Sequence, residues 1–232
     1  MKSIYTFSVA LALISFISCG VDSDGINVIE ATLETDDFDE IRLESSSDVR
    51  IIQSDEFKVI LRGREKDVED VEVRVINNKL TIEENNEHPN DFLIKIYVPE
   101  LSELDCTGSS YVYGESYFTQ DRNFDIRVSG SGELDFAIDT DDVDLKLTGS
   151  GYVYLEGNVQ TLDAEINGSG WLRSFGLVTS LTDVRIEGSG SAEVMVETDL
   201  DIFIIGSGNV FYKGHPDINA QITGSGEVIN SN

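Results

Sequence analysis

A short tripeptide recurs through the second half of the chain at almost constant spacing. Gly-Ser-Gly begins at residues 130, 149, 168, 188, 206 and 224, so successive copies lie 18 to 20 residues apart. A related Gly108-Ser109-Ser110 precedes the first copy by 22 residues. Self-similarity at a fixed period of this size is typical of solenoid folds, in which each repeat builds one coil.

Apolar residues occupy fixed positions around each tripeptide. Two residues before the first glycine stand Cys106, Val128, Leu147, Ile166, Ile186, Ile204 and Ile222. Four residues before it stand Leu104, Ile126, Leu145, Ala164, Val184, Ile202 and Ala220. Four residues after it stand Val112, Leu134, Val153, Leu172, Ala192, Val210 and Val228. The positions between them are mostly polar, and this period of two predicts strands with one buried face.

A strand that returns at the same phase, with no helical pattern between copies, predicts parallel stacking of coil on coil. Glycine suits the corner because it has no Cβ and accepts positive φ. We therefore predict an all-β, single-domain parallel β-helix with coils of about 18–22 residues. The usual hand of parallel crossovers makes it right-handed.

The pattern continues less regularly toward the N-terminus. Residues 41–51, "IRLESSSDVRI", match the later coils in phase, with Ile41, Leu43, Val49 and Ile51 inward. Residues 73–82, "VRVINNKLTI", alternate across an Asn-Asn turn signal. We expect irregular N-terminal coils, or a hairpin, that act as the cap of the repeat.

The first residues have the form of a signal peptide. Lys2 is followed by an apolar run from Ile4 to Ile17 and then by Ser18-Cys19-Gly20. A small residue before the cysteine resembles the lipobox of bacterial lipoproteins, which predicts lipidation of Cys19; an ordinary signal peptide is the alternative. We expect a lipoprotein signal peptide at 1–18, a lipidated Cys and tether at 19–35, and the folded domain at 36–232. The chain would then be anchored by lipid in the bacterial envelope, on a periplasmic or cell-surface face.

The charge of the chain limits its partners. The sequence has 44 Asp and Glu against 16 Lys and Arg, for a net charge of -28. Nucleic acids and anionic lipids would be repelled, so nucleic acid is not an expected partner. The hydrophobic content of 40% still predicts a packed core.

The serial Gly-Ser-Gly turns, the segment "IYVPELSELDCTGSS" and the lipoprotein-like start resemble one family of bacterial envelope proteins. This is the family of auto-transporter adhesin head GIN domains, and the resemblance covers roughly residues 36–230. It implies an exported β-helical domain, with adhesin-like binding as the associated function.

The sequence offers little material for catalysis or for a cofactor. The serines of the tripeptides lack a nucleophile elbow, and six copies indicate a turn. His88 and His215 have no partner cluster and are expected in solvated loops. Cys106 is expected to be a buried, inert thiol. Phosphate-loop, dinucleotide and zinc motifs are lacking, so we expect no enzyme activity, no cofactor and no metal site.

One polar column alternates with the apolar ones. Five residues before the glycines stand Asp125, Asp144, Asp163, Asp183 and Asp201, followed by Asn219. We expect an outward carboxylate ladder, supported by hydrogen bonds to the backbone and by Arg127, Lys146 and Arg185 two positions along. Binding of Ca²⁺ through hard oxygen ligands is the alternative.

Aromatic residues follow the turns, and they suggest the function. The set is Tyr111, Tyr113, Tyr152, Tyr154, Trp171, Phe211 and Tyr212. Outward members would form a docking surface for a glycan or a protein, whereas a covering of corners and edges is the simpler explanation. Three functions stay open: a non-catalytic adhesin-like binding domain, which we favour, a carbohydrate-active β-helix enzyme, and a purely structural envelope component.

Overall fold

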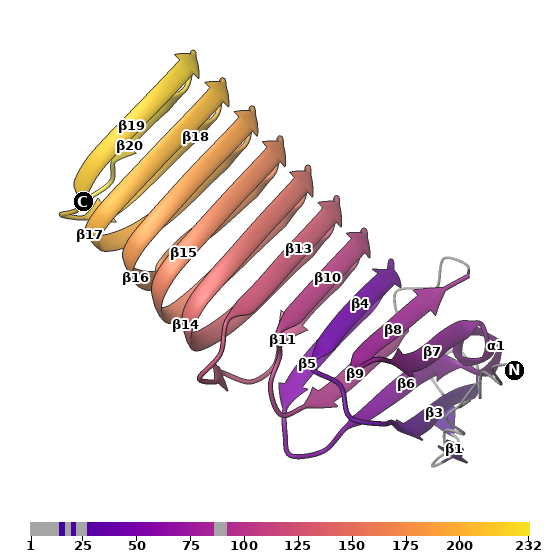
Figure 1. Ribbon diagram of the computed structural model, residues 1–232. Helices are drawn as coiled ribbons and strands as arrows, with labels where there is room; N and C mark the ends of the chain where they lie inside the picture. The colour runs from indigo at the N-terminus through magenta and orange to yellow at the C-terminus, as the bar shows by residue number, and fades with distance from the viewer. Residues whose placement is uncertain (1–13, 17–19, 22–26, 86–91) are drawn as a thin grey trace, which may run out of the picture.

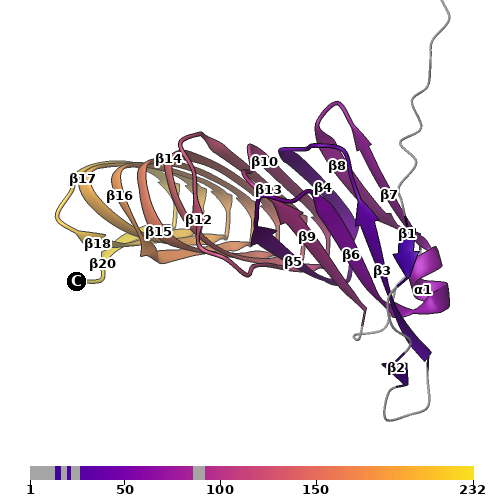
Figure 2. The ribbon, with the colours of Figure 1, turned by 90° about the horizontal axis from the view of Figure 1, so that it is seen from below.

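The computed structural model describes residues 14–16, 20–21, 27–85 and 92–232 of the chain. Figure 1 shows an elongated stack of parallel coils, which meets a curled mixed sheet at its N-terminal end. Figure 2 views the same stack from below and shows the coils enclosing a common interior. The all-β parallel β-helix predicted from the repeat is confirmed.

Two parallel sheets form the long sides of the stack. We call them the entry sheet, which precedes the corners, and the exit sheet, which follows them. The entry sheet contains, in stacking order, β8 (Lys79–Glu84), β4 (Glu40–Ser45), β10 (Glu103–Gly108), β13 (Phe124–Gly130), the second halves of β14 (Glu133–Gly149), β15 (Tyr152–Gly168), β16 (Trp171–Gly188) and β17 (Ser191–Gly206), and β19 (Asp217–Gly224). The exit sheet contains β9 (Leu93–Val98), β5 (Asp48–Gln53), β11 (Tyr111–Gly114), the first halves of β14 to β17, β18 (Asn209–Gly214) and β20 (Glu227–Asn230), while β12 (Phe118–Thr119) pairs with β14.

The Gly-Ser-Gly corners stack directly on one another. The central serine of each corner donates its backbone N–H to the first glycine carbonyl of the corner before it, at 2.8–3.1 Å. The first glycine takes a φ that side chains rarely adopt, +122° at Gly130. A Cβ on Gly130 would lie 2.3 Å from the carbonyl oxygen of Gly108. Positive φ and close approach to the previous coil therefore both require glycine.

The interior is filled by the three predicted apolar columns. Leu147, Ile166 and Val153 are fully buried, and Cys106 is buried as predicted. The columns fail only in the last coil, where Ile222 is 41% exposed and Ala220 is also exposed. The prediction of burial is wrong there because β19 has an inner neighbour, β17, but no described strand on its other side.

The first three coils are not stacked in chain order. The coil of β4 and β5 lies between the coil of β8 and β9 and the coil of β10 and β11, and it pairs in parallel with both. Residues 99–102 carry the chain past that middle coil. Ser102 donates its N–H to the carbonyl oxygen of Asp39 at 2.7 Å. The Gln120 side chain, which is buried, accepts from the N–H of Leu101 and donates to its carbonyl oxygen.

Antiparallel strands and a helix close the N-terminal end. β3 (Asn27–Glu34) pairs with β6 (Lys58–Arg64), and β6 pairs with β9. β1 (Ile14–Phe16) and β2 (Gly20–Val21) lie along β3, and α1 (Glu65–Glu69) packs against β3 and β6. The expected hairpin is present: β7 (Val71–Ile76) joins β8 through Asn77 and Asn78, both with positive φ.

Part of the expected tether belongs to the fold. We expected a tether over residues 19–35, but β3 occupies residues 27–34, and Ala31 and Leu33 are buried. Their alternation is short and has no glycine corner, so the repeat does not reveal it. The signal peptide boundary and Cys19 lie outside the described residues. No helix in the described part of the chain is long and apolar enough to cross a membrane.

Candidate functional site

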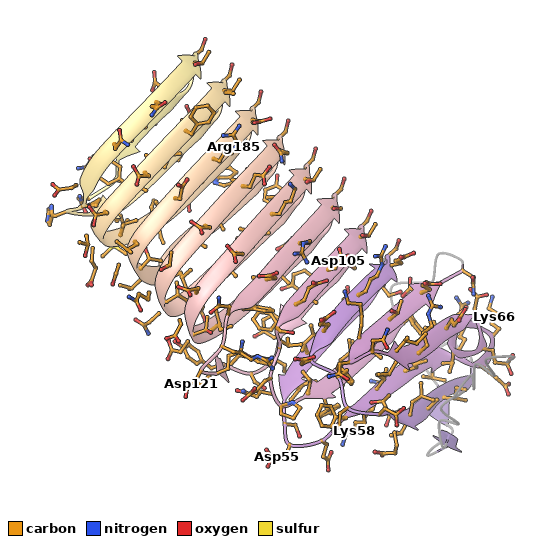
Figure 3. The ribbon with its side chains drawn as sticks, in the orientation of Figure 1. Asp55, Lys58, Lys66, Asp105, Asp121 and Arg185 are labelled. Atoms are coloured by element: carbon orange, nitrogen blue, oxygen red, sulfur yellow. The ribbon has the colours of Figure 1, made fainter. Side chains whose placement is uncertain are left out.

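The entry sheet carries the predicted carboxylate ladder on its outer face. Parallel register places the carboxylates at one height in consecutive coils, and each lies one strand from the next. The column runs Glu103, Asp125, Asp144, Asp163, Asp183, Asp201 and Asn219. A shallow hollow of about 420 Å³ follows it. Figure 3 shows Asp105 and Arg185 on this sheet, in the column beside the ladder.

The neighbouring cations form ion pairs with the ladder only at its start. Arg127 pairs with Glu103 at 2.8 Å and with Asp125 at 3.1 Å. Lys146 instead pairs with Glu165, and Arg185 pairs with Glu187, both outside the ladder. The charge of Arg185 still acts on Asp183 and partly offsets the rise in the pKa of that carboxyl. Of the three cations expected to support the ladder, Arg127 therefore does so directly and Arg185 at longer range.

Two carboxylates of the ladder, Asp144 and Asp183, have a raised pKa. The pKa of Asp144 is raised, first by burial and then by the charges of Asp125 and Asp163. The pKa of Asp183 is raised by burial and by the charges of Asp163 and Asp201. In the described residues, no group of three or more His, Cys, Asp or Glu side chains is placed to hold a metal ion. The arrangement therefore gives the calcium interpretation no support.

The exit sheet carries all seven aromatic residues that the sequence places after the turns. One outward column contains Asp48, Tyr111, Glu133, Tyr152 and Trp171. The column beside it contains Arg50, Tyr113, Asp135, Tyr154 and Arg173. We call the five aromatic residues and the two arginines of these columns the tyrosine face. Phe211 lies farther along the second column, whereas Tyr212 packs partly against the core.

The side chains of the tyrosine face contact one another. The rings of Tyr111 and Tyr113 stack with centroids 6.4 Å apart and planes 11° apart. The Arg50 guanidinium lies 5.8 Å from the Tyr113 ring centroid. The Arg173 guanidinium lies 5.4 Å from the Tyr154 centroid and 4.3 Å from that of Trp171. Tyr111 and Tyr152 are 38% and 40% exposed, so a partner can reach these rings.

Two carboxylates lie between the tyrosines. Glu133 follows Tyr111 and precedes Tyr152 in one column, and Asp135 stands between Tyr113 and Tyr154 in the other. Burial raises the pKa of Asp135, and burial and the nearby Asp135 and Glu133 charges raise the pKa of Tyr111. Neither carboxylate forms an ion pair with a cation of the described chain. We call Tyr111, Tyr113, Tyr152, Tyr154, Glu133 and Asp135 the tyrosine box.

Sequence reasoning found the tyrosines but missed the acids between them. The signal was present three and five residues after each first glycine, where Glu133 and Asp135 occupy the positions of tyrosines in neighbouring coils. Alternation identifies these positions as outward. Alternation along one strand does not show which outward residues of successive coils are neighbours, because the parallel register decides that.

The residues considered for catalysis are dispersed. Cys106 is buried, and burial raises the pKa of its thiol, which makes it a poor nucleophile. The corner serines serve the stacking of the backbone. His215 is exposed near the end of β18, and His88 lies outside the described residues.

The comparisons with known proteins agree with this architecture. A family model described as "Putative auto-transporter adhesin, head GIN domain" matches residues 37–216. The chain belongs to this family. Its predicted resemblance is thereby confirmed over most of the folded domain. No curated protein matches the sequence.

Solved structures of proteins from Bacteroides and Parabacteroides share this fold. A "putative adhesin" from Bacteroides fragilis aligns with a TM-score of 0.82 at 23% identity, over 88% of this chain and 96% of that one. A "putative lipid binding protein" from Parabacteroides distasonis aligns with a TM-score of 0.74 at 25% identity, over 88% and 97%. A "putative adhesin" from Parabacteroides merdae aligns with a TM-score of 0.70 at 21% identity, over 88% and 96%.

Proposed function

We propose that this head GIN domain is a non-catalytic, lipid-anchored envelope protein that binds a partner through its tyrosine face. The main observation behind this proposal is a set of aromatic side chains on one face of the exit sheet. Tyr111 stacks on Tyr113, Arg173 lies over the rings of Tyr154 and Trp171, and Tyr111 and Tyr152 are exposed. Rigid aromatic side chains bring a large contact area to a complex and lose little conformational entropy. The parallel sheet beneath fixes their spacing before any partner arrives.

The family supports recognition as the role. The family model and two of the solved neighbours carry the word adhesin, and none of these names describes an enzyme. The net charge of -28 disfavours anionic polymers such as nucleic acids. Neutral glycans and basic proteins are the compatible classes of partner.

Binding through the tyrosine face is tested with two serine variants on opposite sheets. Tyr152→Ser removes an exposed ring of the tyrosine face. Phe203→Ser is the matched control, because Phe203 is an outward aromatic of the entry sheet that also contacts an arginine, Arg185. The full chain, solubilised in detergent and labelled, is measured for binding to isolated bacterial envelopes and to host extracellular matrix.

We expect Tyr152→Ser to weaken binding several-fold, with little change in melting temperature, and Phe203→Ser to leave binding unchanged. Equal binding by both variants and the wild type would remove the tyrosine face from the proposal. If the wild type binds neither envelopes nor matrix, the structural role becomes the better explanation.

The lipid anchor is a separate part of the proposal. It depends on Ser18-Cys19-Gly20 after the apolar run. Ser18 and Cys19 lie outside the described residues, whereas Gly20 begins β2 and residues 14–16 of the apolar run form β1. Cys19→Ser should release the protein from the membrane fraction or block its maturation. A Cys106→Ser variant is the control, because that buried cysteine has no part in anchoring. Fractionation of Cys19→Ser like the wild type would contradict the anchor.

A carbohydrate-active enzyme is the second candidate, favoured by one feature of the entry sheet. Asp144 has a raised pKa and lies beside Asp125, along the hollow. Carboxyl pairs of unequal acidity are used in glycoside hydrolysis. Turnover of a polysaccharide by the purified chain, lost in Asp144→Asn, would favour this candidate over recognition.

A further inference from the structure

The second outward column of the exit sheet, which contains part of the tyrosine box, has a symmetric order of side chains. In consecutive coils the column places Arg50, Tyr113, Asp135, Tyr154 and Arg173. Guanidinium groups of the chain itself lie over the tyrosines at the two ends of this order, at 5.8 Å for Arg50 and 5.4 Å for Arg173. The position between the two tyrosines holds a carboxylate.

We infer that the tyrosine box binds an arginine side chain of a partner protein. Its guanidinium would lie over Glu133 and Asp135, between two tyrosine rows: the row of Tyr111 and Tyr113 in one coil, and the row of Tyr152 and Tyr154 two coils away. This rests on the proposed function and names the chemistry that the tyrosine face recognises. The partner is a basic polypeptide segment laid across the exit sheet.

The spacing of the coils suits a planar cation. Tyr113 and Tyr154 are two coils apart, which corresponds to about 9.6 Å at the usual strand spacing. A cation is attracted to an aromatic face when it lies within about 6 Å of the ring centroid. A guanidinium midway between the two rows is therefore in range of both, and its N–H donors face the carboxylates in the geometry that arginine prefers.

The charges of the box are uncompensated, in contrast to those nearby. On the entry sheet Glu103 and Asp125 pair with Arg127, and Glu165 pairs with Lys146. Asp135 and Glu133 form no such pair with the described chain, and Asp135 is partly buried. A partly buried carboxylate without a counter-charge is unfavourable, and a guest cation would remove that cost.

Arg173 shows that this surface can hold a guanidinium by stacking. Its guanidinium lies over the rings of both Trp171 and Tyr154. Its Nε is buried and has no hydrogen-bond partner within the described chain. The Arg173 guanidinium is therefore held by ring contacts and not by an ion pair with a carboxylate. A guest guanidinium between the two tyrosine rows would have the same kind of ring contact and, in addition, two carboxylates, Glu133 and Asp135.

Other classes of ligand fit the tyrosine box less well than an arginine side chain does. A neutral sugar would stack on Tyr111 or Tyr152 but would leave two carboxylates without a counter-charge. A calcium ion needs about six to eight oxygen ligands, and two carboxylates fall short of that number. A phosphate or sulfate group would be repelled by both acids.

The test uses a neutral isostere of arginine and variants matched in charge. The probes are acetyl-arginine amide and acetyl-citrulline amide, titrated against the full chain in detergent, with backbone amide shifts of residues 133–135 as the readout. Asp135→Asn is the site variant. Asp163→Asn removes the same charge from the entry sheet and is its control. A Tyr113→Leu, Tyr154→Leu double variant removes the ring contacts of the second column.

We expect arginine amide, but not citrulline amide, to shift these amides in a saturable way. Asp135→Asn and the tyrosine double variant should each weaken this binding about tenfold, and Asp163→Asn less than twofold. Equal weakening by Asp135→Asn and Asp163→Asn would reduce the effect to bulk charge and overturn the inference. Equal shifts with citrulline amide would overturn cation recognition.

The result is distinguishable from failure of the proposed function. If arginine amide does not bind but Tyr152→Ser still weakens binding to envelopes or matrix, the tyrosine face recognises a different chemistry and only the inference fails. Melting curves of each variant identify loss of the fold, and Asp135→Asn, which is nearly isosteric, keeps the test valid if the double variant is unstable.

Discussion

The first coil and the later coils turn the same corner with different residues. Ser45 occupies the place of the first glycine in the coil of β4 and β5, and it lacks positive φ. Its hydroxyl donates to Glu84 at 2.8 Å, and the N–H of Ser46 donates to the other oxygen of that carboxylate. From Gly108 onward, each corner lies instead on the carbonyl oxygen of the corner before it.

The difference teaches that glycine is required by the neighbouring coil and not by the turn alone. A Cβ on Gly108 would meet the carbonyl oxygen of Ser45 at 2.4 Å, so the corner of the coil beneath leaves no room for a side chain at Gly108. The cap also places a cation in the ladder column itself, whereas the later coils place only aspartates and an asparagine there. Lys79 pairs with Glu40 and Glu103 at the start of the column that becomes an aspartate ladder.

The largest expected effect concerns the interior that both regions share. Leu147→Asp would bury a carboxylate at a position with no exposed surface, and we expect loss of cooperative unfolding or several kcal/mol of stability. Thr148→Asp places the same group on the exposed outer face one residue later and should cost less than about 0.5 kcal/mol. Thermal melts of the two variants decide; similar losses would contradict the assigned columns.

Corner substitutions address the comparison directly. Gly168→Ala must accept a φ of +122° and a Cβ 2.6 Å from the carbonyl oxygen of Gly149, and we expect a loss of about 3 kcal/mol. Ser45→Ala keeps its backbone conformation and loses side-chain hydrogen bonds, for about 1 kcal/mol. Chemical denaturation measures both. A larger loss for Ser45→Ala would reverse the explanation of the glycines.

The junction between the cap and the coils depends on Gln120. Gln120→Ala would leave both the N–H and the carbonyl of buried Leu101 without their partner, with an expected cost of about 2 kcal/mol. Gln160→Ala, at an exposed position of β15, is the control and should be nearly neutral. If the two variants denature at the same urea concentration, the Gln120 side chain does not stabilise residues 99–102, which pass the middle coil.

The smallest effects distinguish two carboxylates of one column by pH. Burial favours a raised pKa for Glu103, but hydrogen bonds from Lys79 and Arg127 outweigh it and lower that pKa. The pKa of Asp144 is raised, by burial and by Asp125 and Asp163. Glu103 therefore contributes stability above its unfolded pKa that is lost as pH falls through its lower folded value. Asp144 contributes the opposite, since stability increases as pH falls through its raised folded pKa toward the unfolded value.

At pH 7, Glu103→Gln should lower the free energy of unfolding, and with it the melting temperature, whereas Asp144→Asn should raise both. Each change in the free energy of unfolding should be less than about 1 kcal/mol because both groups contact solvent. At a pH below both pKa values, the two differences should shrink. Melting temperatures of both variants between pH 3 and pH 7, at constant ionic strength, check the signs. A rise for Glu103→Gln at neutral pH would mean that its ion pairs do not stabilise the junction.

The sequence predicts the regular part of the fold well because one rule repeats there. Alternation assigned Val128, Leu147 and Ile166 to the interior, and their burial confirms it. It could not predict that β4 lies between β8 and β10, because alternation records which face is buried and not which strand is adjacent. The exposure of Ile222 has the same origin, since burial in a coil depends on the next coil.

The candidate site also has a part that the sequence predicts and a part that it does not. The tyrosines and the aspartate ladder were each visible as columns, and the register confirms their heights. The pairing of Lys146 with Glu165, and the absence of a cation beside Asp135 in the described chain, depend on side-chain reach across coils. Sequence spacing contains no such information.

The interleaved order of the first three coils has a consequence for the time course of folding. A chain that emerges from its N-terminus presents residues 40–53 early, but their two neighbours in the stack come later, at 79–98 and 103–114. The first coil must therefore wait with both edges unpaired until residues 79–98 have followed it, and with one edge unpaired until residues 103–114 have followed. Every coil after that can add to a finished edge as soon as it is made. Folding of this domain from its N-terminus thus has one slow, aggregation-prone stage near its beginning, followed by rapid growth from one end.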